Sequence, residues 1–105
     1  MSQVEEVAKE IFGEKYRIEK NNSTDFALIV KQSRVRPAAI FPHLDFCVYD
    51  IELDSIIFRH SVNHGNVGWQ NDHQIFFETI PTRAESKRTR QYFDVKSQKS
   101  TTLDP

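Results

Sequence analysis

The sequence has few of the residues from which cross-linked or catalytic small domains are built. Cys47 is its only cysteine, so no disulfide can form within the chain. It has three glycines in all, which is too few for a glycine-rich phosphate loop or a G-x-S-x-G nucleophile elbow. Paired cysteines and an H-E-x-x-H pattern are also missing. From these absences we predict no cofactor, no metal site and no catalytic residue.

Long apolar runs are missing too. No run approaches the roughly 20 apolar residues of a membrane-spanning helix. The segment from Val4 to Phe12 is interrupted by charged residues, unlike the core of a signal peptide. A net charge of −1 gives no overall attraction to nucleic acid or to an anionic membrane. We therefore expect a cytoplasmic protein with no membrane partner.

What the sequence does contain is the composition of a globular protein, with 38% hydrophobic and 28% charged residues in a chain of 105. This length corresponds to one domain, which we place at residues 1–96, followed by a flexible C-terminal tail at 97–105. A chain this short buries roughly 65% of the surface that its unfolded form exposes. Its stability is then marginal, and self-association is one way to bury more surface.

The N-terminal segment predicts a short amphipathic helix. Ser2 and Glu5 have the spacing of a capping box, which satisfies amide donors of the first turn. Apolar residues then recur at helical spacing and form one stripe: Val4, Val7, Ala8, Ile11 and Phe12. Gly13 can end the helix in a left-handed conformation. A helix of about ten residues is unstable alone, so we expect its stripe to dock on a sheet.

The rest of the chain predicts short strands separated by turns. Residues 44–51 and 55–60 form β-rich runs around a turn at Glu52–Asp54, and Asn71-Asp72 suits a second tight hairpin. The connections are short and no second helix intervenes, which favours antiparallel pairing in chain order. We therefore predict an α+β fold, with the helix packed on a mostly antiparallel meander of about five or six strands. Its element order is that of a cystatin-like or half-barrel arrangement.

The first of these hairpins is apolar on both faces. Alternation places one set of side chains on one face: Leu44, Phe46, Val48, Ile56 and Phe58. The opposite face then carries Cys47, Tyr49, Ile51 and Ile57, where a one-sided sheet would be polar. One helix can cover only one of these faces. The other needs the C-terminal segment, a second copy of the chain, or a sheet that curls on itself.

The function that this pattern favours is a non-catalytic protein-interaction module. An exposed apolar patch on a small monomer tends to mark an interface. We predict self-association into a homo-oligomer through Tyr49, Ile51 and Ile57, and a different protein partner is also open.

Two other functions stay open. His43, Asp45 and His64 are the candidates for a small metal-dependent or hydrolytic enzyme, although alternation places another histidine, His60, on the opposite face from His43 and Asp45. The basic and aromatic segment 83–93 is the candidate for binding an anion or a single-stranded nucleic acid. Its contacts would be Arg83, Lys87, Arg88, Arg90 and Tyr92. The acidic middle of the chain disfavours a nucleic-acid partner.

Overall fold

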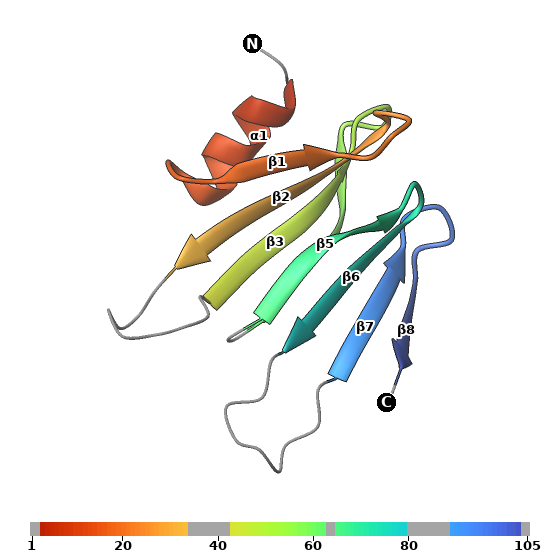
Figure 1. The fold of residues 1–105 in the computed structure, drawn as a ribbon. Helices are drawn as coiled ribbons and strands as arrows, with labels where there is room; N and C mark the ends of the chain where they lie inside the picture. Colours follow the sequence, from red (N-terminus) through yellow and green to blue (C-terminus); the bar gives the residue numbers. More distant parts are fainter. Residues whose placement is uncertain (1–2, 34–42, 63–64, 80–88, 104–105) are drawn as a thin grey trace.

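The computed structural model describes residues 3–33, 43–62, 65–79 and 89–103. Within these residues the chain forms a helix, α1 (Gln3–Phe12), and two four-stranded antiparallel sheets (Figure 1). Sheet A consists of β1 (Arg17–Lys20), β2 (Phe26–Ser33), β3 (His43–Asp50) and β4 (Ser55–Val62). Sheet B consists of β5 (Gly65–Asn71), β6 (Gln74–Thr79), β7 (Thr89–Asp94) and β8 (Lys99–Leu103). Each sheet is a meander whose strands pair in chain order.

The structure confirms the mostly antiparallel α+β fold, but the predicted number of strands is wrong. The described residues contain eight strands in two sheets, in place of five or six in one. One missed strand is β8, which lies in the segment predicted as a tail and pairs with β7 along its length. Its sequence KSTTL has no apolar alternation, so periodicity cannot detect it. Its two threonines are β-branched and suit a strand.

The predicted helix is confirmed as α1. Gly13 ends it with a φ of 75°, and the Gly13 amide donates to the Lys9 carbonyl at 2.8 Å. The Lys31 ammonium on β2 donates to the Phe12 carbonyl at 3.1 Å and satisfies another terminal acceptor. Ser2 of the predicted capping box lies outside the described residues.

The stripe of α1 packs on one face of sheet A. Val4, Ala8 and Phe12 are buried there together with residues of β2 and β3. We call this set the helix cluster, and its buried members from the sheet are Ala27, Ile29, Cys47 and Tyr49. The helix therefore docks as its apolar stripe predicts.

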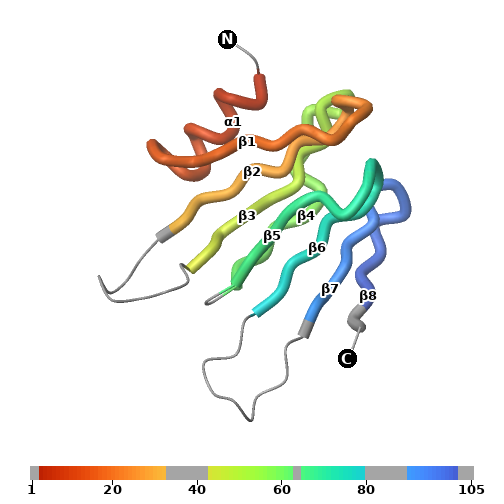
Figure 2. The backbone as a smooth tube through the Cα atoms, in the orientation of Figure 1, coloured from red at the N-terminus to blue at the C-terminus, as the bar shows by residue number. Residues whose placement is uncertain are grey.

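The opposite face of sheet A packs on sheet B through aromatic rings. The Phe46 ring centroid lies 5.3 Å from that of Phe77 on β6 and 6.1 Å from that of Phe58 on β4. Phe58 in turn stacks on Phe93 of β7 with centroids 4.1 Å apart. The other buried members of this intersheet core are Phe26, Leu28, Val30, Leu44, Val48, Val62, Val67, Ile75 and Val95. Figure 2 shows β4 passing behind β5, where the two sheets overlap.

Both apolar faces of the predicted hairpin are thus covered within one chain. Phe46 and Val48 face sheet B, whereas Cys47 and Tyr49 face α1, and all four side chains are at most 1% exposed. Of the alternatives open from the sequence, the C-terminal segment is the one observed, because sheet B covers the face of sheet A that α1 does not.

A register shift changes the predicted pairing in this hairpin. Val48 pairs with Phe58 as expected, but the shift between Val48 and Tyr49 sets Tyr49 opposite Ile56 and not Ile57. Ile56 therefore leaves the intersheet side and is 40% exposed, while Ile57 packs against the intersheet core. The prediction that Ile57 lies beside Tyr49 is wrong, because the bulge changes the pairing of the residues between it and the turn, while Phe58 and the residues after it keep the predicted pairing.

Side chains also join the two sheets along one edge. The Trp69 indole on β5 donates to the Glu19 carbonyl on β1 at 2.8 Å. Nearby, Arg17 on β1 donates to the Val67 carbonyl on β5 at 3.3 Å. These bonds satisfy carbonyls of two edge strands that have no backbone partner on that side. They hold the edges of β1 and β5 together.

Candidate functional site

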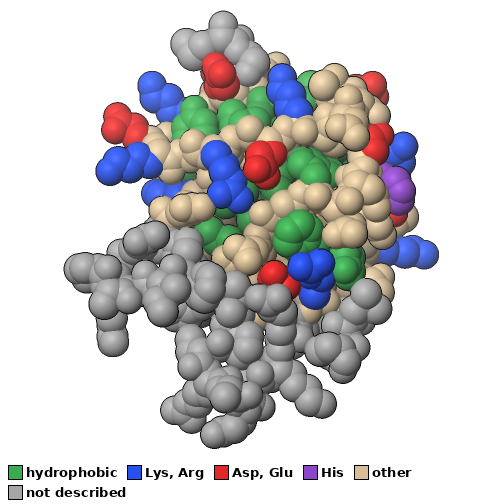
Figure 3. Space-filling view, viewed as in Figure 1, with side chains coloured by type: hydrophobic (Ala, Val, Ile, Leu, Met, Phe, Trp, Pro, Cys, Tyr) green, Lys and Arg blue, Asp and Glu red, His purple; other side chains and the backbone are tan. Residues whose placement is uncertain are grey.

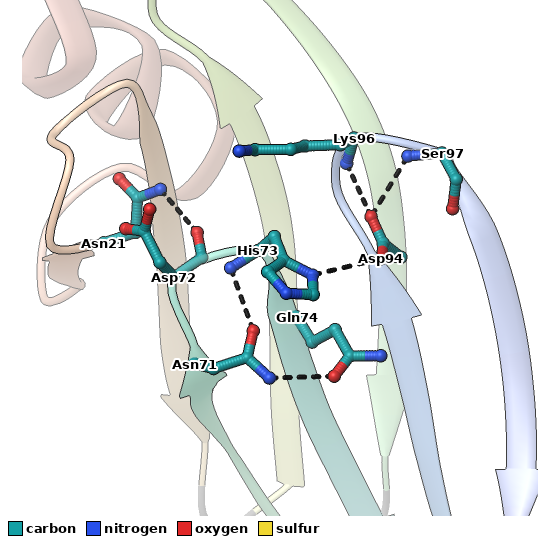
Figure 4. A network of polar contacts seen from close by, with 8 residues as sticks. All are labelled: Asn21, Asn71, Asp72, His73, Gln74, Asp94, Lys96 and Ser97. Carbon is teal, nitrogen blue, oxygen red and sulfur yellow. Dashed lines mark hydrogen bonds and ion pairs between the residues drawn. The ribbon is translucent and has the colours of Figure 1, made fainter.

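The turn of the β1–β2 hairpin is fastened to the turn of the β5–β6 hairpin by polar contacts. The Asn21 amide donates to the Asp72 carbonyl at 2.8 Å (Figure 4). The Asp72 carboxylate accepts from the Ser23 backbone amide at 2.8 Å and also from the Ser23 hydroxyl. These hydrogen bonds lower the pKa of Asp72, because they favour its charged form. The contacts join one end of sheet A to sheet B.

The same end of sheet B carries a second polar group. The Asp94 carboxylate accepts from the backbone amides of Lys96 and Ser97 at 2.9 and 3.0 Å. It also lies 3.2 Å from Nδ1 of His73. Figure 4 marks this contact with a dashed line. The backbone bonds and the histidine lower the pKa of Asp94. Both carboxylates already accept hydrogen bonds from neighbouring groups in the fold. We therefore assign this cluster a structural role at the turns.

Replacing Asp72 by asparagine tests that role through its pH dependence. A carboxyl whose pKa falls on folding adds stability that is fully present above its unfolded pKa of about 3.9. This contribution is lost as the pH falls through the folded pKa. In urea denaturation we expect Asp72→Asn to have a lower free energy of unfolding than the wild type at neutral pH. This difference in free energy should become smaller in acid. Glu52→Gln, in the exposed β3–β4 turn, is the control. If the difference in free energy of unfolding stayed constant across the pH range, Asp72 would not have this structural role.

The candidate catalytic histidines do not meet in one site among the described residues. Nε2 of His43 lies 3.3 Å from a carboxylate oxygen of Asp45, and both side chains are partly exposed. His60 pairs with Phe46, and its ring centroid lies 4.9 Å from that of Phe77. The described residues contain no group of three metal-ligating side chains, and His64 lies outside them. Of the three candidates His43, Asp45 and His64, the described residues therefore show one contact, between His43 and Asp45.

Cys47 is placed where a thiol does not react. Its side chain is fully buried beneath α1. Burial raises the pKa of Cys47 to about 11, although the positive charge of Arg59 acts to lower it. The thiol is then protonated at neutral pH, and a protonated buried thiol is a poor nucleophile.

The residues predicted for self-association do not form one surface. Tyr49 is buried beneath α1, and its hydroxyl donates to the Asp54 carboxylate. Burial, together with that carboxylate, raises the pKa of Tyr49 to about 12. Ile51 is half-buried against the helix cluster, whereas Ile57 belongs to the intersheet side. A second copy of the chain could reach Tyr49 only if α1 moved away.

Of the five contacts predicted in the basic and aromatic segment, Arg90 and Tyr92 lie among the described residues, and both are on β7. Nε of Arg90 is 3.2 Å from the carboxylate of Glu78, and its guanidinium lies 4.7 Å from the Phe76 ring centroid. The Glu78 side chain is 4% exposed. Arg90 thus supplies a paired charge and not a free cation. Arg83, Lys87 and Arg88 lie outside the described residues.

The contacts of Arg90 define a surface that the sequence predictions missed. It is the face of sheet B that points away from the intersheet core, and we call it the outer face. Phe76 sits in the middle of one row across the sheet, between Gly68 on β5 and Tyr92 on β7. A Cβ atom added to Gly68 would lie 3.1 Å from the Phe76 ring, so the ring covers that glycine. The missed signal was the run Ile75-Phe76-Phe77, which is apolar on both faces of β6.

None of the described elements packs on the outer face. Phe76 and Tyr92 each keep part of their surface exposed, whereas their neighbours Ile75, Phe77 and Phe93 are buried. Figure 3 views the molecule from this side, and hydrophobic side chains are visible among polar ones in the area of sheet B. We take the outer face as the candidate functional site.

Within the described residues, no helix is both long and apolar enough to cross a membrane. Comparison of the chain with models of known protein families, with curated proteins and with solved structures gave no match.

Proposed function

We propose that the chain is a non-catalytic protein-interaction module that self-associates through the outer face of sheet B. The observation that carries this proposal is the aromatic pair Phe76 and Tyr92, on neighbouring strands of a face that no described element covers. An antiparallel sheet with one solvated face normally turns polar residues outward. Aromatic side chains are enriched at the centres of protein interfaces, where they contribute much of the binding energy.

The charges of the outer face favour a second copy of the chain as the partner. Arg90 and Lys99 lie on strands of sheet B together with the carboxylates Glu78 and Asp94. Equal numbers of opposite charges give no preference for a polyanion. In a two-fold contact the same patch meets itself, so a face with balanced charges is compatible with its own copy.

The size of the face predicts a weak association. Four strands about 4.8 Å apart, with about six residues each, make a flat face of roughly 20 by 20 Å. Its contact area is then below the roughly 800 Å² per partner of a standard stable interface. We therefore expect a dimer with a dissociation constant in the micromolar range.

The two alternative functions have less support. Catalysis would need polar groups that converge on one site. The described histidines lie apart, on β3, on β4 and in the β5–β6 turn. Nucleic-acid binding through Tyr92 would use a free neighbouring cation, and Arg90 is already engaged by Glu78 and Phe76.

Analytical ultracentrifugation tests the proposal. We expect the wild-type mass to rise from monomer toward dimer up to about 100 µM, the range in which a micromolar interface fills. Tyr92→Lys should be a folded monomer throughout, because it places a charge in the apolar centre of the contact.

Ile56→Lys is the matched control, since Ile56 is an exposed apolar residue on β4, beside Tyr49 and away from the outer face. It should dimerise like the wild type. A wild type that stays monomeric, or a dimer that Ile56→Lys disrupts and Tyr92→Lys does not, would refute the proposed surface.

A further inference from the structure

A cavity of about 330 Å³ opens between the start of β1 and the end of β2. It is lined by Lys15, Tyr16, Arg17, Val30 and Gln32. Arg17 pairs with Val30 across the two strands, and Val30 belongs to the intersheet core. The cavity therefore has an apolar floor and a rim of basic and amide groups. It lies on sheet A, away from the outer face, and its volume is in the range of small-molecule sites.

Lys15 brings a positive charge to this rim. It has no ion-pair partner among the described residues, and its side chain is exposed. Its backbone has a φ of 63°, a left-handed conformation that non-glycine residues adopt rarely. The same conformation occurs at Thr24, Asp54 and Gln98, so at Lys15 it marks the turn between α1 and β1.

The guanidinium of Arg17 is held in place, but not all of its N–H donors are used. One of its terminal nitrogens donates to the Val67 carbonyl at 3.3 Å, which fixes the guanidinium beside the cavity. Its Nε lies 3.7 Å from a carboxylate oxygen of Glu19. That distance exceeds the roughly 2.7–2.9 Å of a charge-assisted hydrogen bond. Since a guanidinium carries five N–H donors, donors remain for a bound anion.

We propose that this cavity binds the phosphate group of a small molecule. A phosphate monoester carries a charge of about −1.5 to −2 at neutral pH, which matches the combined charge of Lys15 and Arg17. A phosphate offers three acceptor oxygens to Lys15, Arg17 and Gln32, whereas a carboxylate offers two. The planar fork of Arg17 suits two phosphate oxygens, and the Gln32 amide adds a donor. Glu14 and Glu19 are the nearby carboxylates that such an anion has to outweigh.

Titration with inorganic phosphate, followed by amide chemical shifts in NMR, tests this site. We expect saturable shifts at residues 15–17 and at Gln32. Lys15→Gln should weaken binding about tenfold or more, as expected for the loss of a hydrogen bond to a charged group. Glu19→Gln should strengthen binding, because it removes the carboxylate that competes for Arg17.

Lys20→Gln is the matched control. It makes the same charge change at the far end of β1, whereas Lys15 lies just before the start of that strand. It should bind phosphate like the wild type. Equal weakening by Lys20→Gln, acetate binding as strong as phosphate binding, or no saturable shift at these residues up to about 10 mM phosphate would overturn the proposal. A dispersed amide spectrum of Lys15→Gln shows that the variant is folded. Because this cavity is separate from the outer face, the outcome does not depend on dimerisation.

Discussion

Replacing Phe46 by alanine should destabilise the protein by about 3–5 kcal/mol, the range for truncating a buried aromatic residue. Phe46 is fully buried, and its ring contacts those of Phe58, His60 and Phe77. Its removal leaves a cavity between the two sheets that rigid strands on both sides cannot close. Small domains have a total stability of about 5–15 kcal/mol, so much of it would be lost.

Urea denaturation measures this effect as a shift of the midpoint at an unchanged slope. Leu53→Ala is the control, because Leu53 is 70% exposed in the β3–β4 turn. It should change stability by less than about 0.5 kcal/mol, as surface substitutions usually do. If Phe46→Ala and Leu53→Ala had similar small effects, the sheets would not be packed face to face through these rings.

Replacing Phe12 by alanine should loosen α1 and cost about 3–5 kcal/mol. Phe12 is buried at the end of the helix stripe, and the Arg59 guanidinium lies 5.7 Å from its ring centroid. The helix is too short to persist without its contacts on sheet A. Its loss would expose the fully buried Cys47 thiol beneath it.

Thiol labelling therefore gives a second measurement of the same change. We expect slow labelling of Cys47 in the wild type and faster labelling in Phe12→Ala, because α1 opens more often. Glu10→Ala, on the exposed side of α1, should label at the wild-type rate. Rapid labelling of the wild type would mean that α1 does not cover sheet A.

Local patterns predicted the elements better than their packing. The stripe from Val4 to Phe12 and the glycine after it predicted α1, because these signals act within a few residues. The bulge after Val48 was not predictable, since alternation carries no information on where one extra residue enters a strand. It arises next to a turn in which Asp54 has a φ of 52° and the Asp50 carboxylate accepts from the Leu53 amide.

The candidate sites depend on contacts that are distant in sequence. Apolar residues on both faces of β3 correctly indicated two covering layers, but the pattern could not distinguish sheet B from a second copy of the chain. Phe76 was absent from the predicted surface because its outward direction follows from the packing of Ile75 and Phe77. The phosphate cavity was missed because Lys15 and Gln32 meet only through the pairing of β1 with β2.

Helix α1 and sheet B cover sheet A within one chain, and the outer face of sheet B is the surface that we propose for self-association. The most direct measurement is a dilution series followed by amide chemical shifts, from about 1 mM to about 10 µM, which spans a micromolar dissociation constant. We predict concentration-dependent shifts at Phe76, Tyr92 and their neighbours on β6 and β7, and none in α1. Shifts confined to α1 and β3, or a spectrum that does not change with concentration, would contradict the account.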